Sequence, residues 1–269
     1  MPELLRVTNT VSFSIIILLQ AICLSFLQPA VLSHVPAYQQ SSNDRDSEIA
    51  RLSVQLRSAD PEGRRDAAMS LSHFKEKTAG SILMGALNDS SPVVRAAIVT
   101  ALGDIGDASA VSSLTRLLAS DKDVFVRKAA AYALGRLPAS ESTTALITAL
   151  KDKDPEVRGA AVVSLGEHSD PATTAPLTSA LSDKNPFVRA RAAVALGRIG
   201  APASGAVQTL IARLKSDEDA EVKRQCATAL GSIGDRSALP ALDALASDSD
   251  PYLSSAARDA IRKLRQEDR

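Results

Sequence analysis

DKDPEVRGAAVVSLG, residues 152–166, is the stretch that decides the fold, because near-copies of it recur along most of the chain. With Pro155 as the anchor, equivalent positions follow one another at intervals of 31 to 34 residues. These anchors are Pro61, Pro92, Val124, Pro155, Pro186, Ala220 and Pro251. A fixed period in this range is typical of a stacked repeat array, in which one unit cannot bury its apolar face alone.

Each anchor is predicted to begin a helix. The residue before it is always Asp, Asn or Ser, whose side chain can cap free backbone N–H groups, and proline at the first helical position loses no hydrogen bond. In most units the side chains two, six, ten and thirteen residues after the anchor are small or apolar, as in Val94, Ile98 and Leu102. This spacing lines one helical face. A second amphipathic run precedes each anchor, so each unit is predicted to be a helical hairpin.

The repeated pattern DxDPxVRxxAxxALGxIG resembles the short HEAT-like repeats first associated with phycobilin lyase subunits. The resemblance covers about residues 46–266, through seven units. It implies an all-α fold, an α-solenoid of about seven helical-hairpin repeats. It says little about activity, since one architecture serves many tasks.

The N-terminal part differs from the repeats. Residues 11–27, VSFSIIILLQAICLSFL, form the longest apolar run, and small residues suitable for cleavage follow at Ser33 and Ala37. Residues 1–37 are therefore predicted to be a signal peptide or an uncleaved N-terminal membrane anchor. Residues 38–47 are polar and are predicted to be a flexible tether without a fold, and residues 48–269 form the solenoid. The chain is expected to be exported, to the periplasm or another extracytoplasmic space.

Opposite charges recur in fixed register. A basic residue lies three positions after almost every anchor and an aspartate three positions before it. The row could be an anion-binding stripe, but opposed charges neutralise each other, so we favour a structural ladder of charge-assisted hydrogen bonds between units. Its members include Arg95, Arg127, Arg158, Arg189, Asp121, Asp152 and Asp183.

Catalytic chemistry finds no support in the sequence. There is no P-loop, Rossmann fingerprint or GxSxG elbow. The three histidines are scattered, and the paired His-Glu motifs carried by some HEAT-like hydroxylases do not occur. His168 belongs to a mixed Glu-His-Ser-Asp cluster that is expected to be a solvated turn, and Cys226 is expected to be a packed core residue. We therefore predict no enzyme activity, no metal and no cofactor.

The position directly after the anchor varies between units. Three units place glutamate there and three place an aromatic residue, although aromatic residues make up only 3% of the chain. Offsets of one, four, five and eight residues from the anchor share a helical side turned away from the core. The rings could fill gaps between helices, or they could form an apolar strip with basic neighbours that binds a partner. The candidate partner-binding residues are Phe125, Lys128, Tyr132, Val163, Phe187, Arg191 and Val194.

The sequence thus predicts a non-catalytic scaffold that binds a protein or peptide through the face lined by the second helix of each unit, the one that starts at the anchor. The resemblance also implies an alternative, a subunit of a bilin lyase or isomerase complex, which the export segment argues against. A nucleic-acid-binding role is the other alternative. Lys plus Arg equals Asp plus Glu at 31 each and tryptophan is absent, which disfavours nucleic acid. Contact with a membrane is expected only through the N-terminal segment, if it is retained.

Overall fold

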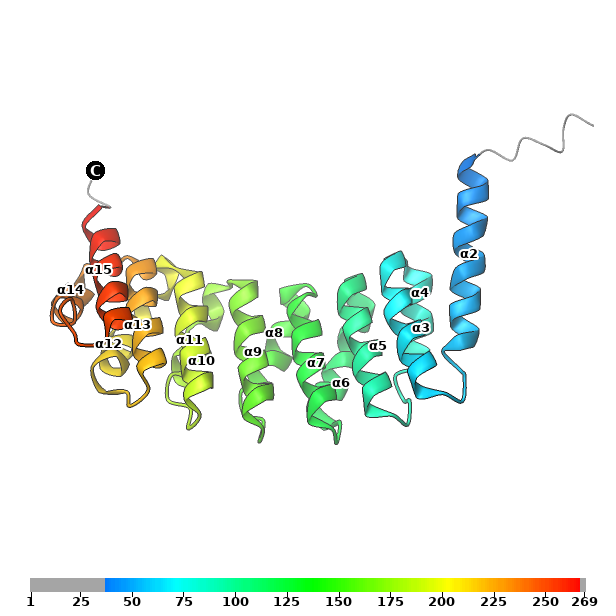
Figure 1. Cartoon of the computed structure of the whole chain (residues 1–269), viewed down its shortest axis with the longest axis horizontal. Helices are drawn as coiled ribbons and strands as arrows, with labels where there is room; N and C mark the ends of the chain where they lie inside the picture. Colours follow the sequence, from blue (N-terminus) through cyan, green and yellow to red (C-terminus); the bar gives the residue numbers. More distant parts are fainter. Residues whose placement is uncertain (1–36, 267–269) are drawn as a thin grey trace, which may run out of the picture. The chain divides into compact units, whose positions relative to one another are not determined.

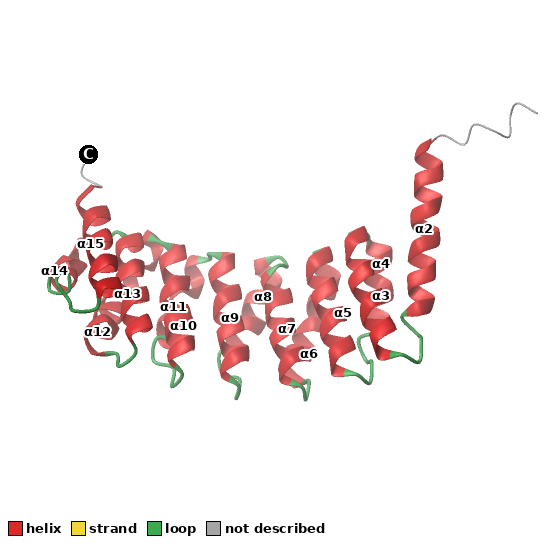
Figure 2. Cartoon of the chain, in the orientation of Figure 1, coloured by secondary structure: helices red, strands yellow, loops and turns green. Residues whose placement is uncertain are grey.

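The computed structural model describes residues 37–266, and this part of the chain is helical without a strand (Figure 2). The predicted all-α class is therefore confirmed. Internal contacts divide the chain into two compact units, Met1–Arg51 and Leu52–Arg269, and the repeats lie in the second.

Every predicted anchor is the first residue of a helix. At most of these starts the preceding Asp or Asn side chain accepts hydrogen bonds from backbone N–H groups of the first turn, as Asp154 does from Glu156. Because these capping contacts are local, the helix starts could be predicted from the sequence. The anchor helices are α3 (Pro61–Leu71), α5 (Pro92–Ile105), α7 (Val124–Gly135), α9 (Pro155–His168), α11 (Pro186–Ile199), α13 (Ala220–Ile233) and α15 (Pro251–Gln266).

A shorter helix precedes each anchor helix from α5 onward and packs against it. Consecutive anchor helices also pack against each other, so the array has one layer of anchor helices and one of preceding helices (Figure 1). The preceding helices are α4 (Lys77–Gly85), α6 (Val111–Ser120), α8 (Ala139–Ala149), α10 (Thr174–Ala180), α12 (Val207–Ser216) and α14 (Leu239–Asp243). Short 3-10 turns precede most of them: η1 (Ser72–Phe74), η2 (Ala108–Ala110), η3 (Pro171–Thr173), η4 (Ala201–Ala206) and η5 (Arg236–Ala238).

The core lies where the periodicity predicts it. In α9, Val157, Ala161 and Leu165 are fully buried, and the residues six and ten positions after the anchor are buried in the other anchor helices as well. Eleven residues after the anchor, a glycine allows the next anchor helix to approach closely. A Cβ added at Gly166 would lie 2.7 Å from the Cβ of Ala195. The repeated glycine therefore sets the spacing between neighbouring units.

The prediction of an unfolded tether over residues 38–47 is wrong, because these residues lie within helix α2 (Ala37–Gln55). The segment contains neither glycine nor proline, and a helix propagates at little cost per residue once it has started. Glu48 and Arg51 add an ion pair at 2.6 Å along the helix. The predicted signal or anchor lies, apart from Ala37, outside the described residues. Among the helices that are described, none is long and apolar enough to span a membrane.

Candidate binding face on helices α7, α9 and α11

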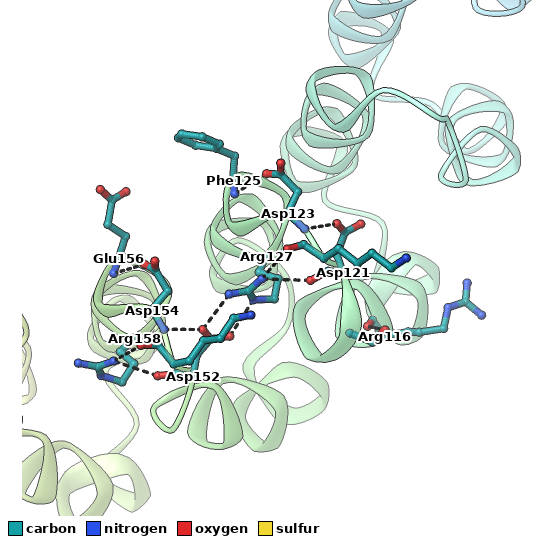
Figure 3. A network of polar contacts seen from close by, with 12 residues as sticks. Arg116, Asp121, Asp123, Phe125, Arg127, Asp152, Asp154, Glu156 and Arg158 are labelled. Carbon is teal, nitrogen blue, oxygen red and sulfur yellow. Dashed lines mark hydrogen bonds and ion pairs between the residues drawn. The ribbon is translucent and has the colours of Figure 1, made fainter.

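The charge ladder joins neighbouring units through arginine and aspartate side chains (Figure 3). Each arginine of the row from Arg64 to Arg189 donates two hydrogen bonds from its guanidinium to both carboxylate oxygens of the next unit's aspartate. The same guanidinium also donates to two carbonyl oxygens of the loop before its own helix. The pairs are Arg64–Asp89, Arg95–Asp121, Arg127–Asp152, Arg158–Asp183 and Arg189–Asp217.

Arg158 illustrates that the hydrogen-bond donors of a ladder arginine are directed at oxygen atoms of the protein. Its Nε and Nη2 lie 2.7 and 2.8 Å from the carboxylate oxygens of Asp183, and its Nη1 lies 2.9 Å from the carbonyl oxygen of Asp152. Burial alone raises the pKa of Asp183, but hydrogen bonds from Arg158 and from the backbone N–H of Asn185 hold that pKa below its usual value. With its donors directed at protein oxygens and its side chain buried, Arg158 offers little to an external anion.

The ladder changes at its C-terminal end. Among the ion pairs of the described residues, none joins Lys223 to Asp248, although their offsets match the pattern. Instead Arg224, one position later in α13, pairs with Asp250 at 3.1 Å and with Glu221 at 2.7 Å. Lysine cannot make the two-pronged contact of a guanidinium, which explains why the geometry differs at this junction.

The candidate partner-binding residues lie on the anchor helices away from the ladder. In Figure 3, Phe125 and Glu156 project from one side of their helices, and Arg127 and Arg158 project from the other. Phe125 and Phe187 are 62% and 46% exposed, so neither ring is enclosed between helices. Val194 is also exposed, whereas Tyr132 and Val163 are half-buried.

A cleft of about 420 Å³ lies on this face and is built from three consecutive anchor helices. We call it the α9 cleft. It brings together four of the seven candidate residues; Phe125, Val163 and Val194 are not part of its lining. The lining residues are Lys128 and Tyr132 from α7, Pro155 and Glu156 from α9, Asn185 before α11, and Phe187 and Arg191 from α11.

Gly159 of α9 makes room for this arrangement. A Cβ at this position would lie 2.9 Å from the Phe187 ring and 3.5 Å from the Arg191 side chain. Because that space is free, side chains of α11 and α7 meet beside α9, where Arg191 Nη1 donates a 3.0 Å hydrogen bond to the Tyr132 hydroxyl. Gly159 is not among the candidate residues predicted from the sequence. Its signal is a glycine four residues after the anchor, which no other unit has.

Cationic side chains lie against the exposed rings. The Arg191 guanidinium carbon is 3.8 Å from the centroid of the Phe187 ring, and Lys128 Nζ is 5.2 Å from that of Phe125. Both distances fall within the range of cation–π attraction. Lys128 also forms an ion pair with Glu156 at 2.5 Å, across from α7 to α9. The face therefore combines apolar surface with two cationic side chains, of which Lys128 is paired with Glu156.

His168 does not lie in a solvated turn. It is thirteen residues after its anchor, a core position that isoleucine fills in several other units, and both ring nitrogens are buried without a hydrogen-bond partner. The repeat register could have revealed this, because the offset is one of those that line the core. Cys226 is buried, and burial raises the pKa of its thiol to about 12, so it stays protonated at neutral pH.

Comparison with protein families agrees with this architecture. HEAT repeats match residues 49–135, 143–208 and 207–269, which is most of the chain. The chain belongs to the HEAT-repeat family. The PBS lyase HEAT-like repeat matches residues 126–152, which supports the resemblance to the short HEAT-like type. No curated protein sequence matches this HEAT-repeat chain.

Solved structures with the same fold include YibA of Escherichia coli, at 23% identity and a TM-score of 0.59, covering 88% of this chain and 90% of that one. An engineered protein matches at 22% identity and a TM-score of 0.55, covering 81% of this chain and 68% of its own. The CpcE–CpcF complex of phycocyanin lyase from Nostoc matches at 22% identity and a TM-score of 0.50, covering 80% and 94%. At these identities the HEAT-repeat fold is what the chains share.

Proposed function

We propose that this HEAT-repeat chain is a non-catalytic scaffold that binds a protein or peptide outside the cytoplasm, through the face carrying the α9 cleft. The observation that carries the proposal is the pair of exposed phenylalanines, one lining the cleft and one outside it, together with Arg191 in the cleft wall, which forms no ion pair within residues 37–266. Aromatic and arginine side chains are the commonest anchors of protein interfaces. Repeat solenoids also use extended surfaces of this kind for binding.

The composition of the face suits a ligand with apolar and acidic residues. Phe125, Phe187 and Val194 supply exposed apolar surface, and Arg191 supplies positive charge, while the charge of Lys128 is paired with Glu156. An extended segment or a helix could lie along such a strip. No residue of the face is required to do chemistry in this proposal.

The extracytoplasmic part of the proposal rests on the apolar run at residues 11–27, which lies outside the described residues. A phosphatase that is active only after export, fused to the C-terminus, tests it. We expect an active fusion in cells. A full-length, inactive fusion recovered from the cytoplasm would contradict export.

The binding part is tested by affinity purification from the cell envelope, comparing the wild-type chain with a Phe125→Ala, Phe187→Ala double variant. A partner recovered with the wild type is then purified and its affinity measured directly. If both rings are anchors, the double variant loses at least about 2 kcal/mol of binding free energy, roughly thirtyfold in affinity.

Tyr252→Ala is the matched control, because Tyr252 occupies the same offset in the last unit and is exposed, but belongs to α15 and not to the face formed by α7, α9 and α11. It should leave binding unchanged. The proposal fails if the double variant binds as tightly as the wild type. It fails equally if binding is lost only in proportion to unfolding, which a parallel melting curve reveals.

A further inference from the structure

Arg191 differs from the ladder arginines in the partners it has. Each arginine of the ladder is paired with an aspartate, whereas no ion pair within residues 37–266 involves Arg191. Its two contacts are with uncharged groups, the Phe187 ring and the Tyr132 hydroxyl. Its positive charge therefore lies at the edge of the cleft without a contacting carboxylate.

These two contacts fix the guanidinium in place. The flat group lies against the Phe187 ring at 3.8 Å, and its Nη1 is 3.0 Å from the Tyr132 hydroxyl oxygen. A guanidinium has five N–H donors in a rigid fork that matches a carboxylate. Because these two contacts already restrict the side chain, less conformational entropy is lost when a ligand binds it.

The opposite wall of the cleft is already neutralised. Lys128 is paired with Glu156, whose side chain is largely exposed. A ligand carboxylate that approached Lys128 would have to compete with Glu156, whereas one that approached Arg191 would not. The free positive charge of the α9 cleft is thus concentrated at one residue.

The surroundings of Arg191 indicate what accompanies the acidic group. The Phe187 ring is partly exposed beside it, and Phe125 and Val194 on the same face, outside the cleft lining, are exposed as well. A small carboxylate alone would leave this surface uncovered. An extended peptide can place an acidic side chain on Arg191 and neighbouring apolar side chains on the rings.

We propose that Arg191 is the specificity-determining residue of this face, and that it selects an acidic side chain flanked by apolar residues in an extended peptide segment of the partner. Tyr132 is a positioning residue that holds the guanidinium over Gly159. This inference rests on the proposed function, since it assumes that the α9 cleft binds a peptide.

A random-peptide display library, selected on the immobilised full chain, tests the inference and does not require the partner to be identified. We expect enriched peptides with Asp or Glu next to aromatic or aliphatic residues. Selection on Arg191→Glu should lose the acidic residue and favour Lys or Arg instead. Enrichment of apolar peptides without an acidic residue would overturn the inference but leave the proposed function intact. If no enriched peptide depends on Phe125 and Phe187, the proposed function itself fails.

Affinities of one selected peptide then test the individual residues. Arg191→Ala should weaken binding about tenfold to a hundredfold, as expected for loss of a charged hydrogen-bonded contact. Tyr132→Phe, which removes only the hydroxyl, should lower the preference for a Glu peptide over its Gln counterpart, while the melting temperature stays unchanged.

Glu156→Gln should strengthen peptide binding roughly threefold by freeing Lys128, a gain that unfolding cannot produce. Equal wild-type affinity for the Glu and Gln peptides would refute the assignment.

Discussion

Replacing Arg158 by alanine tests whether the ladder holds the array together. The side chain donates four hydrogen bonds, two to Asp183 in the next unit and two to loop carbonyl oxygens in its own. The Arg158 side chain is 6% exposed and that of Asp183 is 12% exposed. In Arg158→Ala the Asp183 carboxylate stays largely buried. Among the described residues, the backbone N–H of Asn185 is then the remaining hydrogen-bond donor to it.

The expected loss follows from this geometry. Removing one partner of a buried ion pair costs about 3–5 kcal/mol, because a buried charge is left without its counterion. Asp183 keeps one backbone hydrogen bond and can take up water or a proton, which places the loss at the low end of that range. We therefore expect Arg158→Ala to reduce the free energy of unfolding by about 3 kcal/mol.

Urea unfolding followed by far-ultraviolet circular dichroism measures this loss. Arg136→Ala is the matched control, because Arg136 also forms an ion pair with the neighbouring unit, to Asp104 at 2.6 Å, but the two side chains are 50% and 43% exposed. An exposed pair is worth about 0–1 kcal/mol. In an Arg158→Ala, Asp183→Ala double variant, the combined loss should be smaller than the sum of the two single losses. Equal losses for Arg158→Ala and Arg136→Ala would refute the reasoning, as would additive effects.

Three further predictions concern stability, each measured by urea unfolding. Gly166→Ala should lower the free energy of unfolding by about 1–3 kcal/mol, because the added Cβ would collide with Ala195 of α11. Gly205→Ala should be nearly neutral, because a Cβ added there would have no neighbouring atom within 4 Å. His168→Ile should stabilise the chain by about 1–2 kcal/mol by removing two buried ring nitrogens without partners; destabilisation would show that the ring has a structural role. The ladder aspartates have lowered pKa values in the folded state, so their contribution is present at neutral pH and is lost as the pH falls below about 4. The difference in stability between wild type and Arg158→Ala should therefore shrink in acid, and a constant difference would contradict the linkage.

The sequence by itself determined the repeat and its helices, because the interactions responsible are local or periodic. A cap such as Asp154 bonds to backbone groups only two residues away. The buried face follows from helical periodicity, so Leu165 and its equivalents could be assigned to the core from their spacing alone. The helical state of residues 38–47 could not be read in this way, since polar composition describes both a linker and an exposed helix.

Only the tertiary structure decided how the candidate residues meet. Arg191 and Tyr132 are 59 residues apart and belong to units that are not consecutive, yet they form a hydrogen bond over Gly159. That contact depends on how closely α7, α9 and α11 approach one another, a distance set by small residues at the helix contacts. Periodicity assigns a side chain to a face of its own helix, but the stacking of units determines which side chains from different helices share a cleft.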